Sequence, residues 1–314
     1  MMQAHVFHIL HDNLEWGDTM ASGMNRYTVF LKAAELGSLT RAAQALHYTQ
    51  SGVSHAIAAL EQEVGMPLFL RTGYGVTLTR AGQQLLPAIR QLENARLGLE
   101  QTISQLGSGV SGTLRLGTIS SVSAGWLPEI ITRFERLYPQ VEIAPRDGEY
   151  AAVTQWIEEG QVDCGFLTAP VAAPLYFQPM KRDPMLAVLP FGHPLAQREQ
   201  ITLEDLKDEP ILMETENWER DMRTAFGTLP PLKLRYLLSS AAAVLAMVEK
   251  GLGVTICPAL TVRSFGFRGC TLPLNPPRYR ALGIASLPPA RLSPVARTFL
   301  NFLKETDITE LEQA

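Results

Sequence analysis

The sequence predicts an α/β protein with a helical N-terminal part and a mixed α/β C-terminal part. From Tyr27 to Leu106 apolar residues recur every three or four positions, which is the period of an amphipathic helix. After Gly112 short apolar runs alternate with helical stretches, a pattern typical of βαβ units. Between the two parts lies Gly107–Gly112, whose three glycines resist a helix and leave little side chain to bury, so we expect a domain boundary there.

The composition is that of a chain with packed cores. Its 314 residues are 46% hydrophobic, enough for one large domain or two to three ordinary ones, which excludes intrinsic disorder and collagen-like repeats. Taken whole, the net charge of −4 and the pI near 5.9 argue against a nucleic-acid partner. Residues 24–110, however, contain seven basic and five acidic residues, whereas residues 111–314 contain 20 basic and 23 acidic ones. The helical part is therefore mildly basic.

Cysteine usage and apolar run length bear on the compartment. Cys164, Cys257 and Cys270 are odd in number and have neither CxxC nor zinc-finger spacing, so we expect reduced thiols in a cytoplasmic protein. No stretch reaches the roughly 18 apolar residues of a membrane span. The first 23 residues contain three acidic residues and no Lys or Arg, the reverse of a signal peptide. We therefore expect neither membrane insertion nor secretion.

Residues 1–23 are predicted to be a disordered N-terminal extension. His5, His8 and His11 are spaced by three, which would place them on one side of a helix and could attract a metal. The alternative is a solvated tail, with Met24 as the natural start. We favour the tail and predict no metal site and no cofactor.

Three short helices joined by tight turns are predicted after Met24. Gly37 suits the left-handed turn after the first helix, and Ser38 or Thr40 caps the second. The predicted helices are Tyr27–Leu36, Arg41–Leu46 and a third that opens at Thr49 and Gln50 and runs to Val64. Together they predict a helix-turn-helix from about Ser38 to Ile57.

The third helix has one apolar and one short polar face. Its buried stripe is predicted at Val53, Ile57, Leu60 and Val64. The opposite face carries side chains that can donate or accept hydrogen bonds at base edges in a major groove, namely Gln50, Ser51, Ser54 and His55. The alternative for these residues is the ordinary polar face of a surface helix.

A hairpin wing is predicted next. Pro67–Arg71 and Val76–Thr79 are short strand-like runs, and the turn Gly73–Gly75 joins them. Arg71 and Arg80 stand where they could touch phosphates beside the groove.

These motifs resemble the winged helix-turn-helix of LysR-type transcriptional regulators. The resemblance covers LGSLTRAAQAL from Leu36, TQSGVSHAI from Thr49, and TRAG from Thr79, with PLF and an arginine at 67–71. It implies a DNA-binding domain at residues 24–83 whose recognition helix uses Thr49, Gln50, Ser51, Ser54 and His55. Family members often have Arg where this chain has His55; a neutral His can still hydrogen-bond a base or phosphate.

A long helix is predicted at residues 84–112, ending in a hinge. Seven positions form a heptad seam with alternating spacings of four and three: Leu85, Ile89, Leu92, Arg96, Leu99, Ile103 and Leu106. The alternative is a helix packed on its own domain, but a sixty-residue module cannot cover such a length, so we favour a partner chain. A homodimer places two recognition helices on an imperfectly palindromic double-stranded operator. The resemblance implies the same linker helix and commonly a tetramer assembled from two dimers.

The C-terminal part is predicted to alternate strands and helices. The expected strands are Thr113–Thr118, Val141–Ala144, Cys164–Leu167, Met185–Pro190, Ile211–Met213, Lys233–Leu238 and Val254–Cys257, and the expected helices are Trp126–Tyr138, Ala151–Glu159, Ala241–Lys250 and Pro294–Thr306.

This part resembles the effector-binding domain of the same family. The motifs that carry the resemblance are GTLRLGT from Gly112, DCGF from Asp163 and GLGVTICP from Gly251. The resemblance implies a two-lobed domain like that of periplasmic solute-binding proteins at residues 113–314. Lobe I is expected at about 113–185 and 286–314, and lobe II at about 186–285. A small-molecule effector would bind in the cleft between them.

Polar residues near helix starts and loops are the candidate effector contacts. They are Ser120, Ser121, Ser123, Glu149, Thr168, Glu214, Ser239 and Ser240. Helix capping is the alternative for each serine and threonine. If Glu149 and Glu214 face the cleft, they disfavour a simple carboxylate ligand or require that it carry an amine.

No catalytic motif is present: the sequence contains no GxSxG, P-loop or HExxH pattern, and His193 is expected to cap a loop. We therefore predict a cytoplasmic, dimeric or tetrameric transcription regulator and no enzyme, with RNA polymerase as a candidate partner. The alternative is a cytoplasmic α/β solute-binding or enzymatic protein with an accessory helical module.

Overall fold

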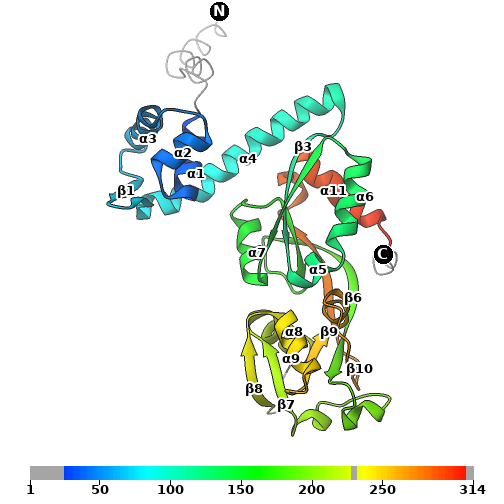
Figure 1. Ribbon diagram of the computed structural model, residues 1–314. Helices are drawn as coiled ribbons and strands as arrows, with labels where there is room; N and C mark the ends of the chain where they lie inside the picture. The colour runs from blue at the N-terminus through cyan, green and yellow to red at the C-terminus, as the bar shows by residue number, and fades with distance from the viewer. Residues whose placement is uncertain (1–24, 228–231, 309–314) are drawn as a thin grey trace, which may run out of the picture. The chain divides into compact units, whose positions relative to one another are not determined.

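The computed structural model describes residues 25–227 and 232–308, which fall into two compact units divided between Asn94 and Ala95. The N-terminal extension with His5, His8 and His11 lies outside the described residues. None of the helices formed by the described residues has both the length and the apolar character that crossing a membrane requires. Figure 1 shows the elements of both units, blue at the N-terminus and red at the C-terminus.

The first unit begins with three helices, as the sequence predicts: α1 (Arg26–Leu36), α2 (Leu39–Ala45) and α3 (Gln50–Val64). Gly37 ends α1 in the left-handed conformation with φ of 60°. Ser38, rather than Thr40, caps α2 by accepting a hydrogen bond from the Arg41 amide. The predicted stripe on α3 is confirmed at three positions, since Val53, Ile57 and Leu60 are buried, while Val64 at the end of the helix is partly buried.

The wing consists of β1 (Phe69–Thr72) and β2 (Gly75–Leu78), which pair antiparallel. The Val76 amide donates to the Gly37 carbonyl at 2.9 Å, which ties the wing to the end of α1. A Cβ atom at Gly75 would lie 2.2 Å from that carbonyl oxygen, and Gly75 also has a φ of 143°. Glycine is therefore required at this contact.

The long helix is α4 (Arg80–Ser108), 29 residues without a break, although Pro87 lies inside it. Within the first unit its start packs on the three-helix core through Ile89. Glu93 is buried and accepts hydrogen bonds from Asn25 Nδ2 at 3.1 Å and Thr28 Oγ1 at 2.9 Å.

The second unit opens with lobe I, which contains parallel strands covered by helices. Its strands β3 (Gly112–Thr118), β4 (Val141–Asp147) and β5 (Cys164–Thr168) lie side by side with β3 in the middle. Helices α6 (Leu127–Leu137) and α11 (Pro294–Glu305) pack together through Phe134 and Phe299, and α7 (Tyr150–Glu158) lies on the other side of the sheet (Figure 1). Their apolar faces form one buried core.

Lobe II is built around two small groups of strands. β7 (Pro210–Glu214) pairs parallel with β8 (Lys233–Leu238), and β9 (Thr255–Pro258) and β10 (Cys270–Pro273) both pair with β6. The remaining short elements of the unit are α5 (Ser120–Ala124), η1 (Pro194–Gln197), η2 (Glu204–Leu206), α8 (Glu216–Phe226), α9 (Ala241–Glu249), α10 (Ala259–Ser264) and η3 (Pro289–Arg291).

One long strand joins the two lobes. β6 (Tyr176–Leu189) pairs with β11 (Tyr279–Ser286) along its first part and with β9 and β10 along its last part. β11 in turn pairs with β5 at Leu282–Ser286, which places that stretch in the lobe I sheet. The result is a seven-stranded sheet in the order β10-β6-β11-β5-β3-β4, with β9 also on β6. The crossover between the lobes is therefore a pair of antiparallel strands.

Candidate functional site

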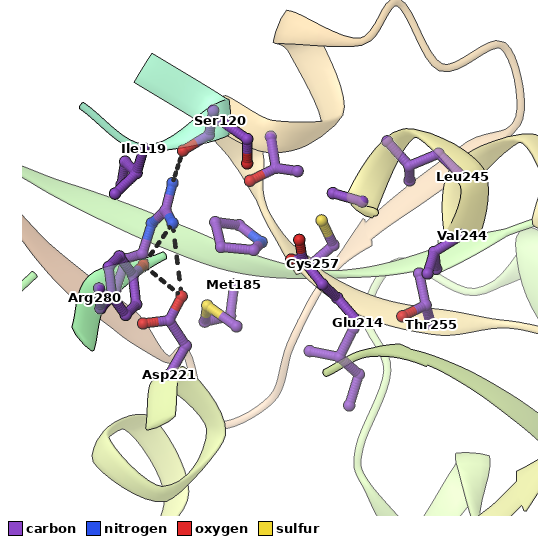
Figure 2. A pocket seen from close by; sticks show the side chains of 16 residues that line it. Ile119, Ser120, Met185, Glu214, Asp221, Val244, Leu245, Thr255, Cys257 and Arg280 are labelled. Carbon is purple, nitrogen blue, oxygen red and sulfur yellow. Dashed lines mark hydrogen bonds and ion pairs between the residues drawn. The ribbon is translucent and has the colours of Figure 1, made fainter. Parts of the chain in front are cut away.

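A cavity of about 30 Å³ lies where residues of both lobes and of the crossover strands meet (Figure 2). That volume has room for one or two water molecules or a head group of that size. Its walls are partly apolar, with hydroxyls and a thiol among them. The lining is Ile119, Ser120, Ser121, Tyr150, Met185, Glu214, Asp221, Ala241, Val244, Leu245, Thr255, Ile256, Cys257, Pro258, Thr261 and Arg280.

Arg280 is the centre of a buried polar network at one side of the cavity. Its side chain is only 4% exposed, and its guanidinium lies 2.9 Å from Asp183 Oδ2 and 3.4 Å from Asp221 Oδ2. It also donates to the Tyr150 hydroxyl at 3.1 Å and to Ser121 Oγ at 3.1 Å. A buried charge needs such partners, because an unpaired one is strongly destabilising.

The network joins five elements. Arg280 and Asp183 stand on the crossover strands β11 and β6, next to each other in the register. Tyr150 opens α7 of lobe I, and its hydroxyl donates to Asp221 Oδ2 on α8 of lobe II at 3.0 Å. Burial raises the pKa of Asp221 above its ordinary value, although the charge of Arg280 acts in the opposite direction. The carboxylate is therefore a direct link between the lobes.

Glu214 lies at the end of β7 and enters the cavity lining from lobe II (Figure 2). Burial, together with the negative charge of Glu149, raises the pKa of Glu214 to about 7. A hydrogen bond from the Ala241 backbone amide, at the start of α9, partly offsets this rise. The carboxyl group is thus partly protonated near neutral pH.

Three of the eight candidate effector residues line the cavity: Ser120, Ser121 and Glu214. The other five do not. Ser123 Oγ donates to the Ile119 carbonyl at 3.1 Å, Thr168 Oγ1 donates to Asp221 Oδ1 at 3.4 Å, and Ser240 Oγ accepts from the Ala243 amide at 3.4 Å. Glu149 is the residue before α7, and Ser239 is exposed.

Sequence reasoning missed the residues of the Arg280 network other than Ser121. The sequence did not predict α8 or β11, so neither Asp221 nor Arg280 was assigned to a helix or strand. One feature of the sequence could have indicated the network. Arg280 directly precedes the apolar run ALGIA, which is typical of a buried strand, and an arginine in a buried strand requires acidic partners. His193 behaves as predicted, since its Nδ1 accepts from the Leu195 amide at 3.2 Å.

The polar face of α3 is a second candidate site, in the first unit. Gln50, Ser51 and His55 are exposed, and Ser54 is partly buried. Thr49 caps the helix, accepting a hydrogen bond from the Gly52 amide at 3.1 Å. The first turns of α3 therefore present short polar side chains to the surface.

The wing is held beside this face by Glu61 of α3. Its Oε1 accepts hydrogen bonds from the amides of Leu68 at 2.7 Å and Phe69 at 3.1 Å. Arg71 on β1 and Arg80 at the start of α4 are both exposed. One exposed arginine thus lies on a wing whose base is fixed to α3, and a second begins the helix that follows the wing.

In the part of the chain that the structure describes, the candidate metal ligands are dispersed, and two of the three cysteines are buried while Cys270 is partly exposed. There, no three His, Cys, Asp or Glu side chains gather as a metal site. Cys164 and Cys257 are buried, and burial raises the pKa of each thiol. A thiol of raised pKa is a poor nucleophile at neutral pH.

Comparison with known proteins identifies both units. Residues 24–83 match the model of bacterial regulatory helix-turn-helix proteins of the lysR family, and residues 107–307 match the LysR substrate binding domain. The chain belongs to the LysR family. It is a DNA-binding transcriptional regulator with an effector-binding domain, which confirms the predicted family and fold class and argues against an enzyme.

Relatives of this LysR-family chain cover more than three quarters of its length. The uncharacterized HTH-type transcriptional regulator YvbU of Bacillus subtilis is 35% identical over 286 residues, covering 88% of this chain and 96% of the relative. A hydrogen peroxide-inducible genes activator of Dickeya chrysanthemi is 31% identical, covering 78% and 82%. The structure of a full-length OxyR variant from Pseudomonas aeruginosa superposes with a TM-score of 0.75 at 22% identity, covering 92% and 97%, which shows the shared fold.

Proposed function

We propose that this LysR-family regulator binds an imperfectly palindromic operator as a dimer or tetramer and responds to a small effector in the cleft between its lobes. The recognition surface is the exposed face of α3 with Thr49, Gln50, Ser51, Ser54 and His55, and Arg71 and Arg80 contact phosphates beside it. The observation that carries this proposal is the pairing of an exposed polar α3 face with a fixed basic wing.

The polar face of α3 supports base contacts rather than bulk electrostatic binding. Gln50 and Ser51 stand in the first turn of the helix, where side chains reach base edges in helix-turn-helix complexes. Because the first unit is only mildly basic, non-specific affinity is expected to be weak. Specific sites are then favoured by the few contacts that read bases.

Exposed apolar residues on α4 support a homodimer. Leu92, Leu99 and Ile103 are 51%, 61% and 60% exposed, and all three belong to the predicted heptad seam. Large apolar side chains in a periodic row are the usual surface of a coiled-coil partner. The side chain of Leu106 lies outside the described residues.

The cavity supports an effector that acts by moving the lobes. Its walls come from lobe I, lobe II and the crossover strands β6 and β11, so a ligand there contacts both lobes at once. A molecule that binds one lobe arrangement better than another shifts the equilibrium between them. Altered spacing of the DNA-binding pairs would then change promoter occupancy, with RNA polymerase as the downstream partner in the cytoplasm.

A thiol-based peroxide response is not part of this proposal. One relative is named a hydrogen peroxide-inducible genes activator, but two of the three cysteines here, Cys164 and Cys257, are buried thiols of raised pKa, and the third, Cys270, is partly buried. Peroxide sensors need exposed, low-pKa thiols. Small-molecule binding in the cleft is the better-supported input.

The test is footprinting of the purified full-length protein on the DNA upstream of its own and neighbouring genes. We expect protection of a dyad in at least one of these regions, and a change in that footprint when the cleft is filled by Val244→Trp. A protein that protects no specific sequence at any salt concentration would overturn the regulator assignment in favour of a solute-binding protein. A cleft variant with an unchanged footprint would overturn the role of the cleft.

A further inference from the structure

Among the described residues that line the cavity, the cation is Arg280, and its donors are already used. Arg280 has five N–H groups, and its three nitrogens donate to Asp183, Asp221, Tyr150 and Ser121. Asp183 Oδ1 also accepts from the Leu260 amide at 3.0 Å, so this carboxylate is fully engaged. An incoming carboxylate or phosphate would find no spare guanidinium donor in the lining.

The charge around the cavity is negative outside the Arg280 network. Within the network the two buried aspartates, Asp183 and Asp221, are balanced by Arg280 and by Arg220, which lies over the Tyr150 ring and acts on Asp221. Glu214 adds a further acidic group to the lining, and Glu149 is close enough for its charge to act on Glu214. Anions are therefore disfavoured in the cleft, and a positive charge would be stabilised.

Glu214 is the acidic group that is open to a ligand. Asp183 is fully buried outside the lining, and Asp221 reaches the lining but already accepts hydrogen bonds from Tyr150, Thr168 and Arg280, whereas Glu214 lines the cavity on the side away from that network (Figure 2). The charged groups that act on it are Glu149 and Asp221, which oppose its ionisation, and Arg280, which favours it. The hydroxyls of Ser120, Thr255 and Thr261 in the same lining can accept further hydrogen bonds from a donor-rich head group.

We propose that the effector of this regulator carries a small protonated amine that pairs with Glu214 in the interlobe cleft. The cavity of about 30 Å³ fits an ammonium head group, and the apolar Met185, Val244 and Leu245 accommodate the carbon atoms next to it. This inference rests on the proposed function, because it specifies the ligand class for the same cleft.

Binding of the amine is coupled to the proton on Glu214. An ammonium group beside the carboxyl favours its ionised form and lowers its pKa below the value of about 7 in the free protein. The complex therefore holds fewer protons than the free protein, and affinity rises as pH increases toward and through 7. This dependence is lost when position 214 cannot ionise.

The experiment compares three probes of equal chain length: propylammonium, propionate and propan-1-ol. Each is titrated into the full-length protein by calorimetry at constant chloride concentration, at pH 6 and pH 8. We expect binding of propylammonium, tighter at pH 8, and at least tenfold weaker binding to Glu214→Gln with no remaining pH dependence. Glu204→Gln is the matched control, because it removes an exposed carboxylate of lobe II outside the cavity lining.

Each contrary outcome overturns the amine assignment. Propionate binding as tightly as propylammonium would do so, as would no heat from propylammonium at either pH, or unchanged amine affinity in Glu214→Gln. The same preparations are footprinted on the operator, and the unfolding midpoint of Glu214→Gln verifies that it is folded. Retained operator binding with failed amine binding rejects only the ligand class, whereas loss of specific DNA binding in the wild type rejects the regulator function itself.

Discussion

At the scale of single residues, two charged side chains of the cleft are in opposite situations. Arg280 is buried and surrounded by acidic and hydroxyl partners, so its environment is complete without a ligand. Glu214 is held by one backbone amide and faces a second carboxylate, so its ionised form is under-stabilised. Arg280 therefore stabilises the fold, whereas Glu214 gives the site an acidic group that a cationic ligand can pair with.

Removing the arginine should therefore be costly for stability. Arg280→Met leaves Asp183 and Asp221 buried without their cation, which we expect to lower the free energy of unfolding by about 3–5 kcal/mol. Urea denaturation measures this change. Arg182→Met, an exposed arginine over the Tyr279 ring, is the control and should cost under about 1 kcal/mol. Equal effects of the two variants would contradict the central role of Arg280.

Glu214 makes the free energy of unfolding depend on pH. The pKa of Glu214 is about 7 in the folded chain and ordinary, near 4.5, when unfolded, so the folded state binds the extra proton between these values. As pH rises through this window, the wild type loses about 2–3 kcal/mol relative to Glu214→Gln. Unfolding midpoints of both proteins at pH 4.5 and pH 8 measure the difference. Parallel pH profiles would show that the carboxyl is not perturbed by folding.

At the scale of elements, α3 and the wing have different roles in the proposed DNA binding. The helix contributes short polar side chains and the wing contributes arginines, while Glu61 joins the two through the Leu68 and Phe69 amides. Base contacts discriminate between sequences, whereas phosphate contacts strengthen binding to every sequence. The two elements should therefore respond differently to substitution.

A paired substitution separates these roles. Gln50→Ala should weaken binding to the operator by about 1–3 kcal/mol and change binding to random DNA little. Arg71→Ala should weaken both and reduce the slope of log affinity against log salt by about one. Gel shifts on operator and random duplexes at several salt concentrations measure both effects. An unchanged salt slope in Arg71→Ala would contradict its phosphate contact.

At the scale of the whole molecule, the exposed seam of α4 is where a second chain is expected. A dimer sets the distance between two recognition helices, so half-site spacing depends on this helix rather than on α3. The seam residues Leu92, Leu99 and Ile103 are too exposed to be explained by packing within one chain.

Breaking the seam should separate the protomers. Leu92→Asp is expected to sediment as a monomer and to lose specific operator binding, because two half-sites no longer bind together. Gln91→Asp, an exposed neighbour off the seam, should remain dimeric. A dimeric Leu92→Asp protein would show that α4 uses another face.

Local patterns accounted for much of the fold. Helices α1 to α3 and the strand at Lys233–Leu238 were predictable, because each has its own periodicity or cap, such as Ser38 at α2 and Thr49 at α3. β6 begins at Tyr176, nine residues before the predicted Met185, because its first half contains Lys, Arg and Pro residues that look like a loop. α8, the helix that carries Asp221, was missed because Glu, Asp and Arg residues make up much of it.

The sequence by itself determined the family, the helix-turn-helix with its wing, and the two-part organisation, since these depend on residues close together in the chain. Only the tertiary structure decided which polar residues meet in the cleft. Arg280 contacts Asp183, 97 residues away, and Tyr150, 130 residues away. Such partners are set by strand order and by the burial of charge, which no local spacing records. The acidic balance of the C-terminal part was visible from composition, but its concentration around Glu214 follows from folding alone.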